Sequence, residues 1–469
     1  MEGLKKKIKS FFKPVADFFR KITYKLMRNV IKELEKEIRA SRSNSSQVLI
    51  PYYKDEFVRI MFLFQAASFW PSWETFYEAC ISDPRIRVEF TFLNELYGDT
   101  TQMLTAKEFL DEKGITYKIY SDSLFSKFSP HILVMQTPYD YGHRTFHVRS
   151  AAFKKKGTRI VYIPYGIELS NTEHAQDAHF YNAVVRNSWK IFTFSERMRE
   201  DYRQYCPNYH AVQCLGHPKF DGLYNKEKFL PLPEVSQQAA KRKILVWHVH
   251  FPKITPQPDG SGVMVTPKLE IYLDFAKYII TQSDLFVVFL PHPKFLDGED
   301  ELGTLAEQII KLLDMAENVY IDWSDDYRNS LLNCDFLITD RSALMIEAAT
   351  AKVPVLYMYN NDYSEPLTPA VQPIIESYYM GSTFYDMENF VAQCINGEDP
   401  KKEIRENAFY NNIPYFDGKS GERIKNHIVD ALMEESLGFI ENEIINLRAD
   451  IQELNKKLEY AQERYGKLS

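Results

Sequence analysis

Short apolar runs alternate with segments of helical periodicity through most of this chain. Apolar runs bounded by polar residues or proline are typical of strands buried in a parallel sheet. Their alternation with helices predicts doubly wound α/β domains. The predicted strands are Val58–Gln65, Val88–Leu93, Tyr117–Tyr120, Ile132–Gln136, Arg159–Pro164 and Ile191–Ser195 in a first series, and Lys243–His250, Leu285–Leu290, Val319–Trp323, Phe336–Thr339 and Val353–Tyr357 in a second.

A proline-containing stretch separates the two series. Residues 225–243 include LPLPEV, which fits neither a helical nor a strand period. Two successive Rossmann-like halves with a cleft between them form the GT-B architecture, although other two-domain α/β proteins share this pattern. We therefore predict an α/β fold with a first Rossmann-like domain over residues 50–228 and a second over residues 240–433.

The start of the chain has a pattern of its own. Residues 1–28 hold nine basic side chains against two acidic ones, and apolar residues recur among them at roughly helical spacing, with a kink expected at Pro14. A basic helix with Phe and Leu on its other face suits an anionic membrane surface. The alternative is a helix packed on the protein's own body. We predict basic amphipathic membrane-surface helices over residues 1–40, followed by a polar linker.

The end of the chain carries a heptad pattern. Apolar residues follow an unbroken 4-3-4-3 spacing with charged residues between them, which predicts a coiled coil over residues 434–469 and self-association through it. The alternative is a lone amphipathic helix folded back on the body. The seam consists of Ile440, Ile444, Leu447, Ile451, Leu454, Leu458, Ala461 and Tyr465.

Composition narrows the class of protein. The chain is 45% hydrophobic and 14% aromatic, so it can bury large cores. Its formal net charge of -7 argues against a general nucleic-acid binder. The five cysteines are scattered without a CxxC or Cys/His cluster, which argues against a disulfide framework or structural zinc and fits a reducing cytoplasm. No apolar stretch reaches the roughly 18 residues of a membrane span.

Two strand ends in the second series carry residues suited to phosphate. Ligands of open α/β sheets lie beyond the carboxyl ends of the strands, and the start of a helix offers N–H groups with partial positive charge. One strand ends in a His-Pro pair, and another leads through a Thr-Asp-Arg-Ser segment into a helical pattern. These features predict a nucleotide or sugar-phosphate donor. The residues concerned are His292, Pro293, Thr339, Asp340, Arg341, Ser342 and Ala343.

In their order along the chain, five segments resemble the CDP-glycerol glycerophosphotransferase family of teichoic-acid-type polyol-phosphate transferases. They are LGHPKFDGL (215–223), KILVWHVHF (243–251), FLPHPK (289–294), CDFLITDRSALMIEAATAKVPVLYMYN (334–360) and FDGKSGERI (416–424). The resemblance implies a GT-B enzyme that needs no metal or cofactor. It would move a glycerol- or ribitol-phosphate unit from a CDP-polyol to a lipid-linked glycan or teichoic-like polymer. The site would be the cytoplasmic face of the cell membrane, with the protein bound peripherally.

The resemblance also implies roles for individual residues. His292 would donate a hydrogen bond or proton to the diphosphate bridge, while Ser342 and the guanidinium of Arg341 would hold its oxygens. Glu347 would bind ribose hydroxyls, or else form a buried pair with Lys352 or an arginine. Asp340 would line the site, or else cap the following helix. The further donor-side candidates are Pro293, Thr339, Ala343, Arg423 and His248.

The acceptor side departs from the family pattern. The family presents a W-H-G-T segment whose histidine is the proposed base, whereas this chain reads VYIPYGIEL, with Tyr165 in that place. A tyrosine with a pKa near 10 is a poor base at neutral pH. Glu168, on the same loop, is the first choice as catalytic base. The other base candidates are His143, His147 and His174, and Asp221 would either orient the acceptor or cap a turn.

Two other functions stay open from the sequence. The same fold could use a sugar nucleotide, as an ordinary glycosyltransferase of surface polysaccharide synthesis. Alternatively, the chain could be a non-catalytic, membrane-attached coiled-coil partner of a polysaccharide assembly. Retention of His292, Asp340 and Ser342 argues against this second alternative, because an inactive site has no need of them.

Overall fold

The computed structural model describes most of the chain. The described residues are 49–53, 56–93, 100–141, 144–256, 262–297, 300–324, 326–364 and 366–466. The predicted basic helices over residues 1–40, the linker that follows them and the candidate base His143 lie outside these ranges. Within the ranges, no helix combines the length and apolar character needed to cross a membrane.

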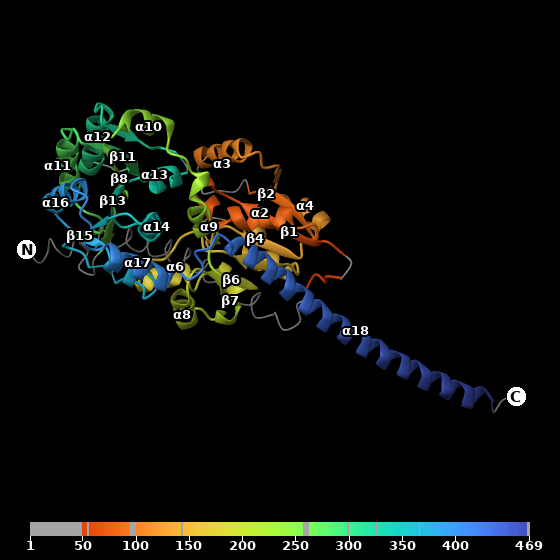
Figure 1. Ribbon diagram of the computed structural model, residues 1–469. Helices are drawn as coiled ribbons and strands as arrows, with labels where there is room; N and C mark the ends of the chain where they lie inside the picture. The colour runs from red at the N-terminus through yellow and green to blue at the C-terminus, as the bar shows by residue number, and fades with distance from the viewer. Residues whose placement is uncertain are drawn as a thin grey trace, which may run out of the picture.

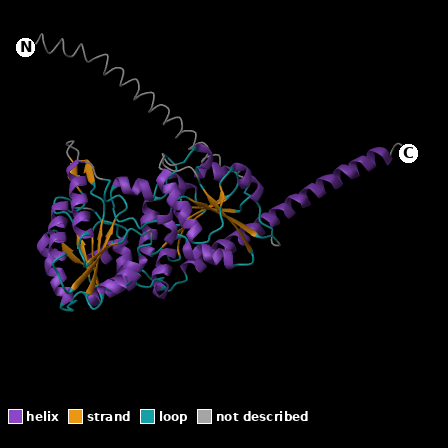
Figure 2. Ribbon diagram, turned by 90° about the horizontal axis from the view of Figure 1, so that it is seen from above, coloured by secondary structure: helices purple, strands orange, loops and turns teal. Residues whose placement is uncertain are grey.

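The first domain is built on a seven-stranded parallel sheet with the order β3-β2-β1-β4-β5-β6-β7. Apolar runs such as VRIMFLF in β1 are buried, because helices cover both faces of the sheet (Figure 2). The strands are β1 (Val58–Phe64), β2 (Ile86–Phe92), β3 (Lys118–Ile119), β4 (Ile132–Met135), β5 (Arg159–Tyr162), β6 (Lys190–Thr193) and β7 (Val212–Cys214). The helices are α2 (Glu74–Ser82), α3 (Thr100–Glu112), α4 (Asp122–Phe128), α5 (Ser150–Lys155), α6 (Glu173–His179), α7 (Ala183–Asn187), α8 (Glu196–Tyr205) and α9 (Pro218–Tyr224).

The second domain repeats this design with a six-stranded parallel sheet in the order β12-β11-β8-β13-β14-β15. Its strands are β8 (Lys243–Val249), β11 (Leu285–Pro291), β12 (Val319–Ile321), β13 (Phe336–Thr339), β14 (Val355–Met358) and β15 (Tyr379–Gly381), and β9 (Ile254–Pro256) pairs with β10 (Gly262–Met264) in a separate hairpin. The helices are α10 (Pro233–Ala239), α11 (Leu269–Ile279), α12 (Asp300–Asp314), α13 (Arg328–Leu332), α14 (Leu344–Ala351), α15 (Gln372–Glu376), α16 (Phe384–Ile395), α17 (Lys402–Asn412) and α18 (Ser420–Gly466).

The order of strands reverses at one point in each sheet. In the first sheet the reversal lies between β1 and β4, and in the second between β8 and β13. Helices that leave neighbouring strands on opposite faces of the sheet open a crevice at such a point, and ligands of doubly wound folds bind there. The predicted α/β class with two Rossmann-like domains is therefore confirmed, and the topology directs attention to the ends of β8 and β13.

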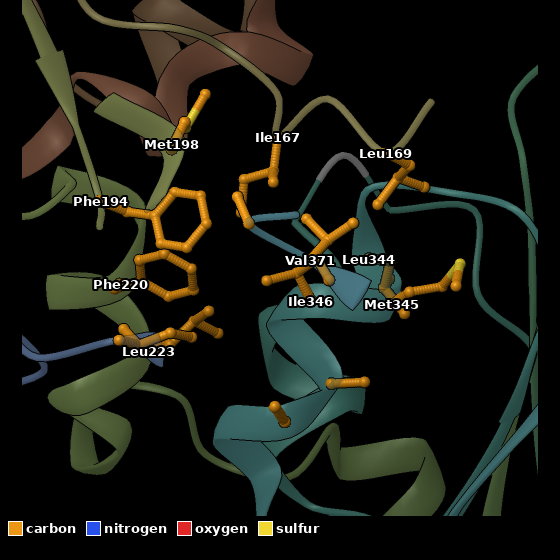
Figure 3. Close-up of a cluster of buried hydrophobic side chains, with 14 of the residues drawn as sticks. Ile167, Leu169, Phe194, Met198, Phe220, Leu223, Leu344, Met345, Ile346 and Val371 are labelled. Atoms are coloured by element: carbon orange, nitrogen blue, oxygen red, sulfur yellow. The ribbon is translucent and has the colours of Figure 1, made fainter. Parts of the chain in front are cut away.

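One hydrophobic cluster contains buried side chains from both domains. Figure 3 shows this cluster, in which side chains of α9 and the loop after β5 face side chains of α14. The labelled residues are Ile167, Leu169, Phe194, Met198, Phe220 and Leu223 from the first domain, and Leu344, Met345, Ile346 and Val371 from the second. Backbone hydrogen bonds join the same regions, from Asn171 N to Pro366 O (2.7 Å) and from Thr368 N to Leu169 O (2.9 Å). The loop after β5 is therefore held against the second domain.

The last helix crosses back to the first domain. Ile424, Ile428, Val429 and Leu432 of α18 are buried in the core beside β1 and α2, although we had assigned residues up to 433 to the second domain. Beyond this contact the helix runs away from the body (Figure 1). Predicted seam residues on this part, among them Leu447 and Ile451, are exposed. The helix is as expected, but whether its seam pairs in a coiled coil stays a prediction.

Candidate functional site

Asp340 ties together the ends of β8 and β13, where the second sheet reverses. Its Oδ1 accepts a hydrogen bond from the backbone N of His250 (2.8 Å), and its Oδ2 accepts one from the hydroxyl of Tyr272 (2.8 Å). Close by, Nδ1 of His248 and Oγ1 of Thr339 share a hydrogen bond of 2.9 Å. Asp340 and Thr339 are fully buried. The carboxyl group of Asp340 thus holds the end of β8 and the ring of Tyr272 in place, and its expected roles in lining the site or capping α14 stay predictions.

Burial raises the pKa of Asp340 to about 7, against an ordinary value of about 3.9. A raised pKa in the folded state means that folding favours the protonated carboxyl. The stability it contributes is therefore full below about pH 4 and lost as the pH rises toward 7. We expect the melting temperature of the wild type, relative to Asp340→Asn, to fall across this window. Melting curves from pH 4 to 8 test this, and parallel curves for the two proteins would contradict it.

His292 lies at the end of β11 with a defined tautomer. Its Nδ1 accepts a hydrogen bond from the backbone N of Lys294 (3.0 Å), so the proton of the neutral ring is on Nε2. Its backbone N donates to Val249 O (2.8 Å), which ties it to β8. Burial, aided by the charge of Lys294, lowers the pKa of His292 to about 4. At neutral pH this half-buried imidazole is therefore an uncharged N–H donor.

Arg341 and Ser342 form the turn between β13 and α14, as predicted. The hydroxyl of Ser342 accepts a hydrogen bond from Leu344 N (3.1 Å), and its own hydrogen can be donated to a ligand. Burial lowers the pKa of His250 to about 3, and the charges of His292 and Arg341 act in the same direction. The ring centroids of His250 and His292 are 4.8 Å apart. Donors of hydrogen bonds and a fixed positive charge thus gather beside the reversal point, as a diphosphate requires.

Glu168, the predicted base, is paired with a histidine that sequence reasoning missed. Its Oε2 lies 2.6 Å from Nε2 of His179, at the end of α6, and its Oε1 accepts a hydrogen bond from Ser170 N (2.7 Å). Burial acts to raise the pKa of Glu168, but His179, Ser170 N and the charge of Arg341 outweigh it and lower the pKa.

Two tyrosines adjoin this pair. The hydroxyl groups of Tyr139 and Tyr165 share a hydrogen bond of 2.8 Å, and the ring of Tyr139 meets that of His179 edge to face, with 6.4 Å between centroids. The other two described base candidates do not contact this pair. His174 is exposed in the first turn of α6, and His147 is exposed and forms a hydrogen bond with Thr145 Oγ1 (3.0 Å). No spacing in the sequence points to His179, because a turn and most of a helix separate it from Glu168.

The LGHPKFDGL segment places Asp221 against the start of α18 and against α2. Asp221 accepts hydrogen bonds from Ser420 N (2.9 Å), Gly421 N (2.8 Å) and the hydroxyl of Thr75 (2.9 Å), so it caps the start of α18 against α2. The carboxyl group is fully buried. These contacts match the capping alternative for Asp221, and its catalytic role stays a prediction. A Cβ on Gly421 would collide with the backbone of α2, so this close approach requires glycine.

Glu347 and Arg423 both lie in ion pairs, and their donor-side roles stay predictions. Nζ of Lys219, in α9, lies 2.9 Å from Oε1 of Glu347, and the hydroxyl of Tyr327 donates to Oε2. The cation of this buried pair is therefore Lys219 of the other domain, and not Lys352 or an arginine. Arg423 forms an ion pair with Asp417 (2.8 Å) and donates to Leu215 O (3.0 Å). Both residues hold the joint between the domains.

Comparison with known proteins identifies the family pattern on the donor side. Residues 281–430 match the model of the family described as CDP-Glycerol:Poly(glycerophosphate) glycerophosphotransferase. The predicted resemblance to this family, and with it the predicted class of enzyme, is thereby confirmed over this segment. The matching segment begins just before β11 and includes His292 and the turn before α14. No curated protein matches the sequence at a significant level.

Solved structures resemble the whole fold of this glycerophosphotransferase-like chain. A UDP-N-acetylglucosamine 2-epimerase from Listeria monocytogenes aligns with a TM-score of 0.58 and 13% identity, over 81% of this chain and 97% of the epimerase. The wall teichoic acid polymerase TagF aligns with a TM-score of 0.53 and 16% identity, over 89% of this chain and 98% of that chain. The epimerase of Neisseria meningitidis, bound to UDP-GlcNAc, gives 0.54 and 14%, over 79% and 100%. At these identities the likeness concerns the fold alone.

Proposed function

We propose that this protein transfers a glycerol- or ribitol-phosphate unit from a CDP-activated donor to a growing cell-surface glycan or teichoic-like polymer. The observation that carries the proposal is the position of the family match. Residues 281–430 contain β11, β13 and the turn before α14, where His292, Arg341 and Ser342 gather at the carboxyl ends of the strands. The match and the geometry of the donor side therefore support the same chemistry.

The geometry suits attack on the distal phosphorus of a diphosphate. As the acceptor oxygen bonds to this phosphorus, the bond from the phosphorus to the bridging oxygen breaks, and negative charge grows on this oxygen, which leaves with CMP. In the proposed mechanism Nε2–H of His292 donates to the bridging oxygen, the hydroxyl of Ser342 donates to a neighbouring phosphate oxygen, and the guanidinium of Arg341 binds two phosphate oxygens as a fork. Lys294 N fixes the tautomer of His292 before the ligand arrives. The donors are thus oriented in advance for the charge that develops.

The deciding experiment measures nucleotide release by the purified full chain. CDP-glycerol, CDP-ribitol and a panel of sugar nucleotides are each supplied with a lipid-linked acceptor, and the product is analysed for an added polyol phosphate. CMP release from a CDP-polyol, with growth of the acceptor, supports the proposal. Turnover of a sugar nucleotide alone would make the protein a glycosyltransferase. Silence with every donor would favour the non-catalytic partner.

We also propose that the reaction takes place at the cytoplasmic face of the cell membrane, with the protein bound peripherally. The support is the basic amphipathic pattern over residues 1–28. Co-sedimentation with vesicles of phosphatidylglycerol, compared with phosphatidylcholine, tests it. Binding should require the anionic lipid and weaken when Lys5, Lys6 and Lys7 are replaced by glutamine. Equal behaviour toward both lipids would contradict the proposal.

A second copy of the chain is the partner that we propose for the seam of α18. Seam residues such as Leu447 and Ile451 are exposed, and their heptad spacing is that of a coiled coil. Light scattering should give a multiple of the 55.0 kDa monomer for the wild type and the monomer mass for Leu447→Lys/Ile451→Lys. Ile445 is equally exposed but off the seam, so Ile445→Lys should keep the wild-type mass. A monomeric wild type would overturn this assignment.

A further inference from the structure

We propose that His179 is the general base that activates the acceptor hydroxyl, and that Glu168 is its positioning residue. The inference rests on the proposed transferase function and concerns its acceptor side. In this assignment Glu168 is not itself the base.

The contacts of the pair assign a different task to each member. Both oxygens of Glu168 are occupied, one by His179 (2.6 Å) and one by Ser170 N (2.7 Å), so this carboxylate is anchored and poorly placed to take a proton from a substrate. Because Nε2 of His179 faces a carboxylate, the proton of the neutral ring belongs on Nε2. The lone pair is then on Nδ1, which has no hydrogen-bond partner among the described residues. A carboxylate that orients a histidine in this way is a known arrangement for general-base catalysis.

The location of His179 compensates for the missing histidine after β5. The side chain of Tyr165 occupies that strand end, bonded to Tyr139 (2.8 Å), and the ring of Tyr139 contacts that of His179. The end of α6 thus brings an imidazole against Tyr139, one side chain away from the position that Tyr165 fills. Thr172 fixes the start of α6, since its side chain accepts a hydrogen bond from Ala175 N (3.3 Å). A helix C-terminus also favours the positive charge that the imidazole acquires.

Contacts with the second domain hold the pair toward the donor. The carbonyl of Glu168 accepts a hydrogen bond from Oγ1 of Thr368 (3.1 Å), and Leu169 O accepts one from Thr368 N (2.9 Å). The charge of Arg341, in the donor-side turn, reaches Glu168. Glu168 is therefore anchored to the second domain, and it holds the partly exposed His179 on the side of the first domain that meets the second.

The proposed step involves the acceptor hydroxyl, the CDP-polyol and the imidazole of His179. The acceptor hydroxyl oxygen forms a bond to the distal phosphorus of the CDP-polyol, and the bond from that phosphorus to the oxygen of CMP breaks, with its electron pair leaving on CMP. The hydroxyl proton moves to Nδ1 of His179. Glu168 stabilises the imidazolium that results, and solvent later takes the proton.

The test separates acceptor chemistry from donor binding. His179→Gln keeps a donor for Glu168 but has no basic nitrogen, so transfer to the acceptor should fall by about 100-fold to 10,000-fold. The affinity for CDP-glycerol, measured by titration calorimetry, should stay within a factor of about two, since no donor contact is lost. Added imidazole should restore part of the rate of His179→Ala. The matched control is His210→Gln, an exposed histidine of the first domain, with wild-type transfer expected.

Glu168→Gln tests the positioning role through separate values of kcat and KM. An amide keeps the size of the side chain but cannot balance the charge of the imidazolium, so kcat for transfer should fall while KM for the acceptor and the affinity for CDP-glycerol stay within a factor of about two. A loss of affinity for CDP-glycerol together with the loss in kcat would leave Glu168 a purely structural role and overturn that part. If His179→Gln transfers the polyol phosphate near the wild-type rate, the base assignment is overturned. The proposed function still stands in that case, provided that the wild type binds CDP-glycerol. A wild type that neither binds nor turns over a CDP-polyol would overturn both.

Discussion

Replacement of His292 by alanine is expected to lower CMP release from a CDP-polyol by about 100-fold to 10,000-fold. The imidazole presents Nε2–H at the end of β11, because Lys294 N occupies Nδ1 and burial keeps the ring neutral above about pH 4. Alanine removes this donor from the oxygens on which charge develops. Single-turnover measurements at saturating donor report the chemical step directly.

The control for His292→Ala is a change in the same turn that removes no donor. Leu296 is exposed there, and Leu296→Ala should keep the wild-type rate. His292→Gln adds a second comparison, since its amide can donate and should recover part of the loss. If His292→Ala releases CMP at the wild-type rate, the strand end is not the site of the chemistry. If Leu296→Ala is equally impaired, the effect belongs to the shape of the turn.

Replacement of Lys219 by methionine is expected to destabilise the protein by about 3–5 kcal/mol. The change leaves Glu347 as a buried carboxylate without its cation, and both side chains are almost fully enclosed, with 8% and 2% of their surface exposed. Desolvation of an unpaired charge is the physical cause. Chemical denaturation followed by fluorescence measures the change in the free energy of unfolding.

Two further variants test the origin of this loss. Lys219→Met/Glu347→Gln removes both charges and should recover most of the stability, because no unpaired ion is left behind. The matched control is Lys243→Met, which breaks an exposed pair with Asp335 of the same length, 2.9 Å, and should cost no more than about 1 kcal/mol. If Lys219→Met and Lys243→Met lower the free energy of unfolding equally, burial of the Lys219–Glu347 pair does not cause the larger loss that we expect.

The apolar runs predicted most of the strands, because a strand buried on both faces must be apolar along its length. The run Phe336–Thr339 coincides with β13, and the donor-side residues follow from it as residues at a strand end. The strands β7 (Val212–Cys214) and β15 (Tyr379–Gly381) were missed, because three residues with a polar or glycine member show no period. Short edge strands depend on their neighbours more than on their own sequence.

Roles that depend on distant partners could not be predicted from the sequence. The carboxylates of Asp221 and Glu347 stand in segments that look functional, but their roles are decided by Ser420 N and Lys219, which are 199 and 128 residues away. The same holds for His179, whose partner is fixed by the path of the chain after β5. A motif shows that a residue is constrained, and only packing shows whether a ligand or another part of the protein constrains it.

The length of α18 determines how far its last turns lie from the two domains. A helix of 47 residues is about 70 Å long at 1.5 Å per residue, and the part beyond Leu432 accounts for about 50 Å of this. Figure 1 shows this part projecting freely from the first domain. A second copy paired along the seam would therefore meet the protein at a distance from the donor-side residues. We expect a truncation beyond Leu432 to remove self-association through the seam and to leave the rate of transfer unchanged.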